Sequence, residues 1–316
     1  MAGSSMPRTG DHSILTAIGG TPLIRLGGIV PDGAAEVWVK LEGGNPTGSY
    51  KDRMALSVIR AALERGDIRQ GDTLVEFTGG STGMSLALVA GVLGLKFTAV
   101  FSDAFSHSKQ QAMEAFGATV VVEHSDDGLI TTALAERMRE RAHDLAAQPG
   151  HHYVDQFGSP DVPPGYVPMG TEIATSLGGE FDVFCHGVGT GGALMGALDG
   201  MRAAGASPQV VALEPTQAPL LSEGRSGAHS VEGIAVFTDP PFLDRSRLDD
   251  VRAIDQDRAF DTCRRLACSE GVFAGASTGL NVAAAIELAE QLGSGHRVVT
   301  IACDTGLKYL GEQPYV

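Results

Sequence analysis

A lysine at the junction of a turn and a helical pattern is the first candidate for chemistry. The segment from Asn45 to Arg53 reads Asn-Pro-Thr-Gly-Ser-Tyr-Lys-Asp-Arg. Ser49 followed by Asp52 has the spacing of a capping box, which predicts that Lys51 lies in the first turn of a helix. The helix dipole disfavours a positive charge there, so we expect a lowered pKa for Lys51 and an amine that can attack an aldehyde. Lys51 could therefore form a Schiff base with pyridoxal phosphate, or it could be a solvated lysine on an ordinary capped helix.

Two glycine-rich turns each follow a short apolar run and precede a helical pattern. Residues 78–83 read Thr-Gly-Gly-Ser-Thr-Gly, which could hold a carboxylate or phosphate or could simply be a tight, well-capped turn. Residues 187–192 read Gly-Val-Gly-Thr-Gly-Gly, the strongest isolated signal for a phosphate cradle. This second turn also fits G-x-G-x-x-G, and Glu214 follows Gly192 by 22 residues, where a dinucleotide fold would bind a ribose. An NAD-dependent oxidoreductase that uses the Gly187 turn therefore stays open.

Small hydroxyl residues mark a fourth segment, residues 275–279 together with residues 303–306. A serine such as Ser277 could bond a neutral ring nitrogen without protonating it, or these residues could be plain helix caps. The pair His151-His152 lacks carboxylate or cysteine partners at ligand spacing, so we interpret it as a loop pair and expect no metal. The sequence contains no G-x-S-x-G elbow and no Walker A motif.

Short β-branched runs alternate with longer amphipathic runs, a pattern that predicts an α/β protein with mostly parallel sheets flanked by helices. The expected strands are Glu36–Leu41, Thr73–Phe77, Phe97–Phe101, Thr119–Val122, Phe181–Cys185, Gln209–Leu213 and Arg297–Ala302. The expected helices are Asp52–Arg65, Met84–Leu93, Ser108–Phe116, Leu129–Leu145, Gly192–Ala203, Asp255–Glu270 and Leu280–Leu292. The Pro-rich stretch Ser159–Pro168 predicts a division near Gly158, and Pro215–Leu243 reads as a long loop.

Length and charge narrow the class of protein. The 316 residues allow one large α/β unit or two domains, and 43% hydrophobic with 19% charged residues is a globular balance. A net charge of −15 argues against nucleic acid or an anionic membrane as the main partner. The polar amino terminus, which we expect to be loose, resembles no signal or transit peptide, and the apolar run Leu86–Leu95 is too short to span a bilayer. Four scattered cysteines, without disulfide or zinc spacing, fit a cytoplasmic protein best.

In this order, the four segments resemble the cysteine synthase and cystathionine β-synthase family, the fold type II enzymes that use pyridoxal 5'-phosphate. The resemblance runs from Gly20-Thr21-Pro22-Leu23 to Tyr309-Leu310, and the segment around Lys51 is highly specific to this group. It implies that Lys51 is the catalytic lysine that carries the cofactor, that the Gly187 turn binds its phosphate and that Ser277 bonds its pyridine nitrogen. The residues that it assigns to the cofactor are Lys51, Ser81, Gly187, Gly189, Thr190, Gly191, Gly192 and Ser277. Those that it assigns to the substrate carboxylate are Thr78, Gly79, Gly80, Thr82 and Gln156.

The match departs from the family pattern at three positions. The substrate loop usually reads Thr-Ser-Gly-Asn-Thr-Gly, whereas here Gly79 replaces serine and Ser81 replaces asparagine. Gly79 predicts a wider substrate pocket, and the shorter Ser81 predicts a lost or rerouted bond to the ring hydroxyl of the cofactor. Ala193 in place of threonine removes one hydroxyl from the phosphate site. We expect cofactor binding to survive these changes.

The resemblance implies β-replacement on an O-activated L-serine or similar amino acid through an aminoacrylate, with a small nucleophile as second substrate. The alternative within the family is a β-eliminating lyase that releases pyruvate and ammonia. A cofactor-holding or partner-binding protein that has lost efficient catalysis is a second hypothesis, motivated by Gly79 and Ser81. The resemblance further implies a homodimer, a smaller mobile α/β domain at residues 43–158, and a larger cofactor-binding domain at residues 1–42 and 159–316.

Overall fold

The computed structural model describes residues 13–128, 131–234, 239–311 and 313–316. The prediction of a loose amino terminus lies almost wholly outside these residues, as do the start of the expected helix at Leu129 and residues 235–238 of the long expected loop. The described chain forms two compact units. The first contains the residues up to Gly19, Asn45–Thr47 and Lys51–Gly165, and the second contains Gly20–Gly44, Gly48–Tyr50 and Tyr166–Val316.

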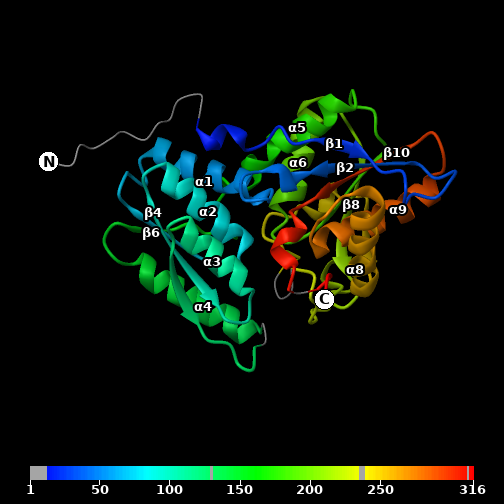
Figure 1. Ribbon diagram of the computed structural model, residues 1–316. Helices are drawn as coiled ribbons and strands as arrows, with labels where there is room; N and C mark the ends of the chain where they lie inside the picture. The colour runs from blue at the N-terminus through cyan, green and yellow to red at the C-terminus, as the bar shows by residue number, and fades with distance from the viewer. Residues whose placement is uncertain (1–12, 129–130, 235–238, 312) are drawn as a thin grey trace. The chain divides into compact units, whose positions relative to one another are not determined.

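The first unit is a four-stranded parallel sheet with the strand order β5-β4-β3-β6. Helices lie beside this sheet (Figure 1). On one face, Val75 and Val100 pack against apolar side chains of a single helix, α4. The strands are β3 (Thr73–Phe77), β4 (Lys96–Ser102), β5 (Thr119–Glu123) and β6 (His151–Tyr153). The helices are α1 (Lys51–Arg65), α2 (Ser81–Val92), α3 (His107–Ala115) and α4 (Thr132–Ala146).

The second unit is built on a six-stranded sheet with the order β1-β2-β10-β7-β8-β9. Strand β1 is antiparallel to β2, and the other neighbours are parallel, so the carboxyl ends of β10, β7 and β8 meet at one edge. The strands are β1 (Leu23–Arg25), β2 (Glu36–Leu41), β7 (Val183–Gly187), β8 (Gln209–Pro215), β9 (Asp250–Ile254) and β10 (Arg297–Ala302). The helices are α5 (Val167–Ser176), α6 (Gly192–Ala203), α7 (Leu220–Glu223), α8 (Gln256–Arg265) and α9 (Ala276–Leu292).

Helices α8 and α9 cover one face of this sheet, and α5 and α6 lie on the other side (Figure 1). The core on the α9 side joins inward-facing strand residues to small residues of the helix, so that α9 can lie close to the strands. Apolar residues fill α9 on nearly all sides, as expected for a helix in the interior of a unit. No helix in the described part of the chain combines the length and apolar character needed to cross a membrane.

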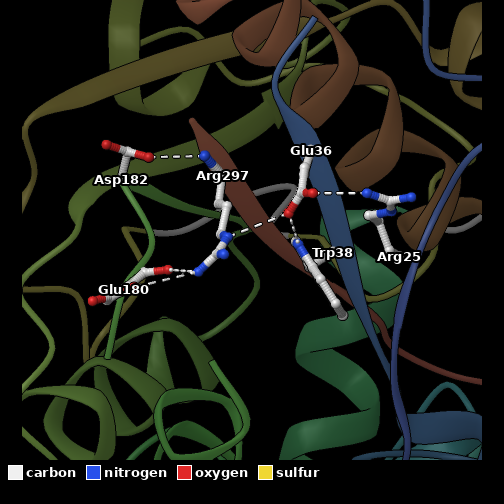
Figure 2. A network of polar contacts seen from close by, with 6 residues as sticks. All are labelled: Arg25, Glu36, Trp38, Glu180, Asp182 and Arg297. Carbon is white, nitrogen blue, oxygen red and sulfur yellow. Dashed lines mark hydrogen bonds and ion pairs between the residues drawn. The ribbon is translucent and has the colours of Figure 1, made fainter. Parts of the chain in front are cut away.

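A network of charged side chains joins strands at the amino-terminal end of this sheet (Figure 2). Glu36 of β2 accepts from Arg25 of β1 at 2.7 Å, from the Trp38 indole at 3.0 Å and from Arg297 of β10 at 3.3 Å. The backbone N–H of Arg297 donates to Asp182 at 2.8 Å. These contacts lower the pKa of Glu36, and the hydrogen bond from Trp38 lowers it most. The network thus stabilises the strand order β1-β2-β10-β7 at the edge opposite the strand carboxyl ends.

The α/β architecture with parallel sheets flanked by helices is confirmed, and the interpretation of one histidine pair as a loop is wrong. His151-His152 lies in β6 rather than in a loop, because its pairing with β3 is a long-range contact that local residue types do not reveal. The division predicted from Ser159–Pro168 stays a prediction; this stretch runs directly into α5, since Pro168 occupies the first turn, where a missing N–H costs nothing. The loop expected over Pro215–Leu243 contains α7, a single turn.

The domain boundaries at residues 43 and 158 stay predictions, as does the mobility of the smaller domain. The compact units differ from them in detail, because the segment before Lys51 alternates between the units and the first unit continues to Gly165.

Candidate active site

Lys51 is the first residue of α1, in the first helical turn as its spacing predicts. The three residues before it are hydrogen-bonded to the chain that follows β10, and Ser49 forms an isolated β-bridge with Asp304. Gly48 O accepts from Thr305 N at 2.9 Å, and Tyr50 N donates to Cys303 O at 3.0 Å. Gly48 has a φ of +74°, and a Cβ there would lie 2.5 Å from the Thr305 side chain, so glycine is required. The backbone leading into Lys51 is therefore held at the carboxyl end of β10.

Asp52 anchors the start of α1 from the other side. Its carboxylate, which the capping-box prediction assigned to the helix end, accepts from Thr47 N at 2.8 Å and from Thr47 Oγ1 at 2.5 Å. It also accepts from Ser85 Oγ of α2 at 2.6 Å. A buried carboxylate with three donors ties the two helices together and fixes the turn on which Lys51 sits.

Ser277 lies in the first turn of α9, and its neighbour connects it to the same strand end. Thr278 Oγ1 accepts from the N–H of Cys303 at 3.0 Å. The Cys303 peptide group therefore binds the residue before Lys51 through its carbonyl oxygen and the residue after Ser277 through its N–H. Among the described residues the Ser277 hydroxyl makes no hydrogen bond, so it can bond a ring nitrogen.

The glycine turn between β7 and α6 has the geometry of an anion cradle. β7 ends at Gly187, α6 begins at Gly192, and Gly191 caps the helix with a left-handed φ of 84°. A Cβ at Gly191 would lie 2.7 Å from Leu243 N, and one at Gly189 would overlap the carbonyl oxygen of Gly233. Glycine is therefore required by close backbone approach, and the first N–H groups of α6 favour a phosphate. The Thr190 hydroxyl accepts from Gly192 N at 3.3 Å.

Asn281 supports this turn and was missed by the sequence analysis. Its buried side chain accepts from Gly187 N at 2.8 Å and donates to Ile301 O at 2.8 Å, so it joins α9 to the ends of β7 and β10. An asparagine inside an otherwise apolar helical run is the signal that could have revealed it.

The predicted substrate loop and Gln156 are brought together, although 74 residues separate Thr82 from Gln156. Thr82 Oγ1 donates to Gln156 Oε1 at 2.9 Å, and Gln156 Nε2 donates to Phe77 O at 2.9 Å. The Thr78 hydroxyl accepts from Gly80 N at 3.0 Å and Gly83 N at 3.1 Å, so it caps α2 and retains its own proton as a donor.

The expected widening at Gly79 is not found on the side where a side chain would begin. A Cβ at Gly79 would lie 3.0 Å from the Phe105 ring, so this aromatic side chain fills that space. Gly80 is also constrained, since it has a φ of +131° and a Cβ there would lie 2.5 Å from the stem of Lys109. Ser81 begins α2, and its carbonyl oxygen lies 3.0 Å from Ser85 Oγ, whose shorter contact is the one to Asp52.

Glu76, the second residue that the sequence analysis missed, lies under the substrate loop. It is fully buried in β3, and burial raises the pKa of its carboxyl group to about 8. Its two oxygens accept from the backbone N–H groups of Phe77 and Gln156 at 3.0 and 2.9 Å. A lone acidic residue inside an apolar strand was the available signal.

Glu214, the acidic residue on which the NAD-dependent alternative relied, is already fully bonded within the protein. Glu214, expected to bind a ribose, accepts from Leu221 N at 2.6 Å, Ser222 N at 3.0 Å and Ser222 Oγ at 2.6 Å. Its carboxylate therefore caps α7. Within the described residues no group of three histidine, cysteine or acidic side chains is placed to hold a metal ion.

Comparison with known proteins identifies the family of the chain. The family described as "Pyridoxal-phosphate dependent enzyme" matches residues 14–304. The chain is 38% identical to O-ureido-L-serine synthase of Streptomyces lavendulae over 95% of this chain and 91% of that protein. It is 36% identical to the cysteine synthase of Staphylococcus aureus (strain Mu50 / ATCC 700699) over 96% of both chains.

Solved structures give the same result. A crystal structure of O-ureido-L-serine synthase matches with a TM-score of 0.89 and 38% identity over 96% of this chain and 95% of that chain. The O-acetylserine-dependent cystathionine β-synthase from Helicobacter pylori matches with a TM-score of 0.87 and 32% identity over 96% and 99%. The NAD-dependent oxidoreductase alternative is therefore wrong, and the cofactor is pyridoxal 5'-phosphate. The chain belongs to the pyridoxal-phosphate-dependent enzymes of fold type II, in the cysteine synthase family.

Proposed function

We propose that this protein catalyses β-replacement on an O-activated L-serine. The observation that carries the proposal is the Cys303 peptide group, which holds the residues next to Lys51 and Ser277 at the carboxyl end of β10. This strand lies beside β7, whose carboxyl end opens into the Gly187 turn. Ligands of α/β sheets bind at such strand ends.

The residues fit pyridoxal phosphate by their chemistry. We assign the aldehyde to Lys51, the phosphate to Gly187, Gly189, Thr190, Gly191 and Gly192, and the ring nitrogen to Ser277. Ser81 is assigned to the ring hydroxyl. When bound, the cofactor acts as the electron sink that makes the α-proton of the amino acid acidic and the β-substituent a leaving group.

The protein supplies binding and proton transfer. Thr78, Gly79, Gly80, Thr82 and Gln156 hold the carboxylate of the amino-acid donor. Once the donor amine has taken the place of Lys51, the Lys51 Nζ atom accepts the α-proton of the donor. Ser277 presents a neutral hydroxyl to the ring nitrogen and so leaves that nitrogen unprotonated, which favours prompt loss of the β-substituent.

Replacement is favoured over elimination because the relatives that match over nearly the whole chain are named as synthases. One structural relative, a hydrogen sulfide-producing enzyme from Fusobacterium nucleatum, shares 32% identity with a TM-score of 0.86. Assays with O-acetyl-L-serine and with O-phospho-L-serine, each with sulfide or hydroxyurea, separate the two reactions. A new β-substituted amino acid supports replacement, whereas pyruvate as the main product with every nucleophile contradicts it.

The first prediction concerns Lys51. We expect Lys51→Ala to abolish the absorbance band of the lysine-bound cofactor together with turnover, since no other amine in our assignment carries the cofactor. Absorbance spectra and product assays of the purified variant check both effects. Retained turnover in Lys51→Ala would contradict the assignment. The variant Lys96→Ala, at the exposed start of β4, serves as control.

A homodimer in the cytoplasm completes the proposal. The family resemblance supports the dimer, and four free cysteines support a reducing compartment. Light scattering of the purified protein tests the first point, and fractionation of the producing cells tests the second.

A further inference from the structure

The buried carboxyl group of Glu76 is not used by the proposed chemistry, yet it contacts the substrate side of the first unit. It lies in strand β3, one residue before Phe77 and two residues before the first residue of the substrate loop. Each of its oxygens accepts one backbone hydrogen bond: Oε1 from Phe77 N at 3.0 Å and Oε2 from Gln156 N at 2.9 Å. Glu76 thus joins the end of β3 to the segment that follows β6.

Gln156 closes a ring of hydrogen bonds with these groups. Its side-chain Nε2 donates to Phe77 O, and its Oε1 accepts from Thr82 Oγ1, both at 2.9 Å. Gln156 is therefore held at its main chain by Glu76 and at its side chain by Phe77 and Thr82. Removing the carboxyl group would release the main chain of Gln156 and leave two buried N–H groups with fewer acceptors.

We propose that Glu76 is a positioning residue for the carboxylate of the amino-acid substrate, because it fixes Gln156 and, through it, Thr82. This inference rests on the proposed function, which assigns Gln156 and Thr82 to that carboxylate. Glu76 itself touches neither substrate nor cofactor in this role.

The charges around Glu76 give the role a pH dependence. Burial raises the pKa of Glu76, the N–H groups of Gln156 and Phe77 lower it, and Asp155, directly before Gln156, raises it further. Tyr153 of β6 has a pKa raised by burial and by Glu76 and Asp155, and Arg139 of α4 lowers it. Ala99 of β4, which pairs with Glu76, brings no charge. Ionisation of Glu76 above pH 8 would place a negative charge behind the substrate loop. This charge would repel the carboxylate of the amino-acid substrate and weaken its binding.

Glu76→Gln is the informative variant, since an amide has only one acceptor oxygen for the two N–H groups. We expect the KM for O-acetyl-L-serine to rise about tenfold or more, while kcat and cofactor absorbance stay near their wild-type values. In the wild type the KM should also increase as pH rises through 8. In Glu76→Gln this pH-dependent increase should be absent. Glu123→Gln, on β5 of the same sheet, is the matched control.

Hydrogen exchange gives a readout that does not need activity. Peptides that contain Phe77 and Gln156 should exchange faster in Glu76→Gln than in Glu123→Gln, with or without cofactor. If Glu76→Gln does not fold, Glu76→Asp is the second variant, since it keeps both acceptor oxygens. It should retain the pH dependence of KM and increase KM by less than the roughly tenfold rise expected for Glu76→Gln.

The outcomes separate the inference from the proposed function. A wild-type protein without a cofactor band or without β-replacement would overturn the proposed function. A wild type that catalyses the reaction, with Glu76→Gln unchanged in KM, pH profile and hydrogen exchange, would overturn the inference alone. A fall in kcat with unchanged KM would also overturn it, because a positioning role for the substrate carboxylate acts on binding.

Discussion

An aromatic ring packs against Gly79, where the family usually has a serine. The Phe105 ring contacts the face of Gly79 from which a serine side chain would project. Gly79 therefore lies in contact with a second residue, in a segment between β4 and α3. The close packing of this space favours a retuned substrate loop over a decayed one.

We expect Gly79→Ser to destabilise the protein by about 1–3 kcal/mol, since the new Cβ would lie 3.0 Å from the Phe105 ring, which must then shift within its packing. The double variant Gly79→Ser with Phe105→Ala should recover part of that loss relative to Phe105→Ala alone. Urea unfolding of the wild type, both single variants and the double variant measures the coupling. Strictly additive changes would show that the two positions are independent.

Rebuilding the usual family loop with Gly79→Ser and Ser81→Asn tests the hypothesis of lost catalysis. We expect no large gain in synthase activity, because Phe105 still occupies the space beside position 79. A large gain in turnover of O-acetyl-L-serine would instead support a decayed site.

At the scale of elements, two glycines set the distance between α5 and α6. A Cβ at Gly170 of α5 would overlap the carbonyl oxygen of Ala197, and one at Gly200 of α6 would overlap that of Val167. The two helix backbones therefore touch, which allows α5 to fix the helix whose amino terminus forms the proposed phosphate site.

Gly170→Ala and Gly200→Ala should each lower the free energy of unfolding by about 1–3 kcal/mol or more, because backbone atoms cannot move aside as flexible side chains can. Gly27→Ala, where a Cβ meets nothing within 4 Å, is the control and should change little. Chemical denaturation measures the three values. A neutral result at Gly170 and Gly200 would mean that α5 can slide along α6 without cost.

For the whole molecule, pH-dependent stability follows from Glu76. Its folded-state pKa of about 8 lies above the ordinary value of 4.5, so the folded protein holds this proton more tightly than the unfolded chain. The resulting stabilisation is fully present below pH 4.5 and is lost as pH rises through 8. We expect the free energy of unfolding to fall between pH 4.5 and 8 more steeply in the wild type than in Glu76→Gln, and the two slopes to become equal above this range. Equal slopes would contradict the raised pKa.

The sequence alone determined the class of the fold and the family of enzymes, with its cofactor. Strands β2, β3 and β10 begin and end where predicted, because apolar β-branched runs bounded by turns are a local signal. The lysine segment and both glycine turns are also contiguous, so their residue types and spacing identified the cofactor family. The three strands that were missed, β1, β6 and β9, are short edge strands whose existence depends on a neighbouring strand.

Only the tertiary structure decided which residues support those motifs. The order β2-β10-β7 brings Cys303 between the neighbours of Lys51 and Ser277, and folding brings Gln156 onto Glu76 and Phe105 onto Gly79. Each of these contacts joins residues far apart in the chain, where periodicity and propensity carry no information. Their physical origin is the need of buried polar groups for partners and of close-packed backbones for space, which only the folded chain defines.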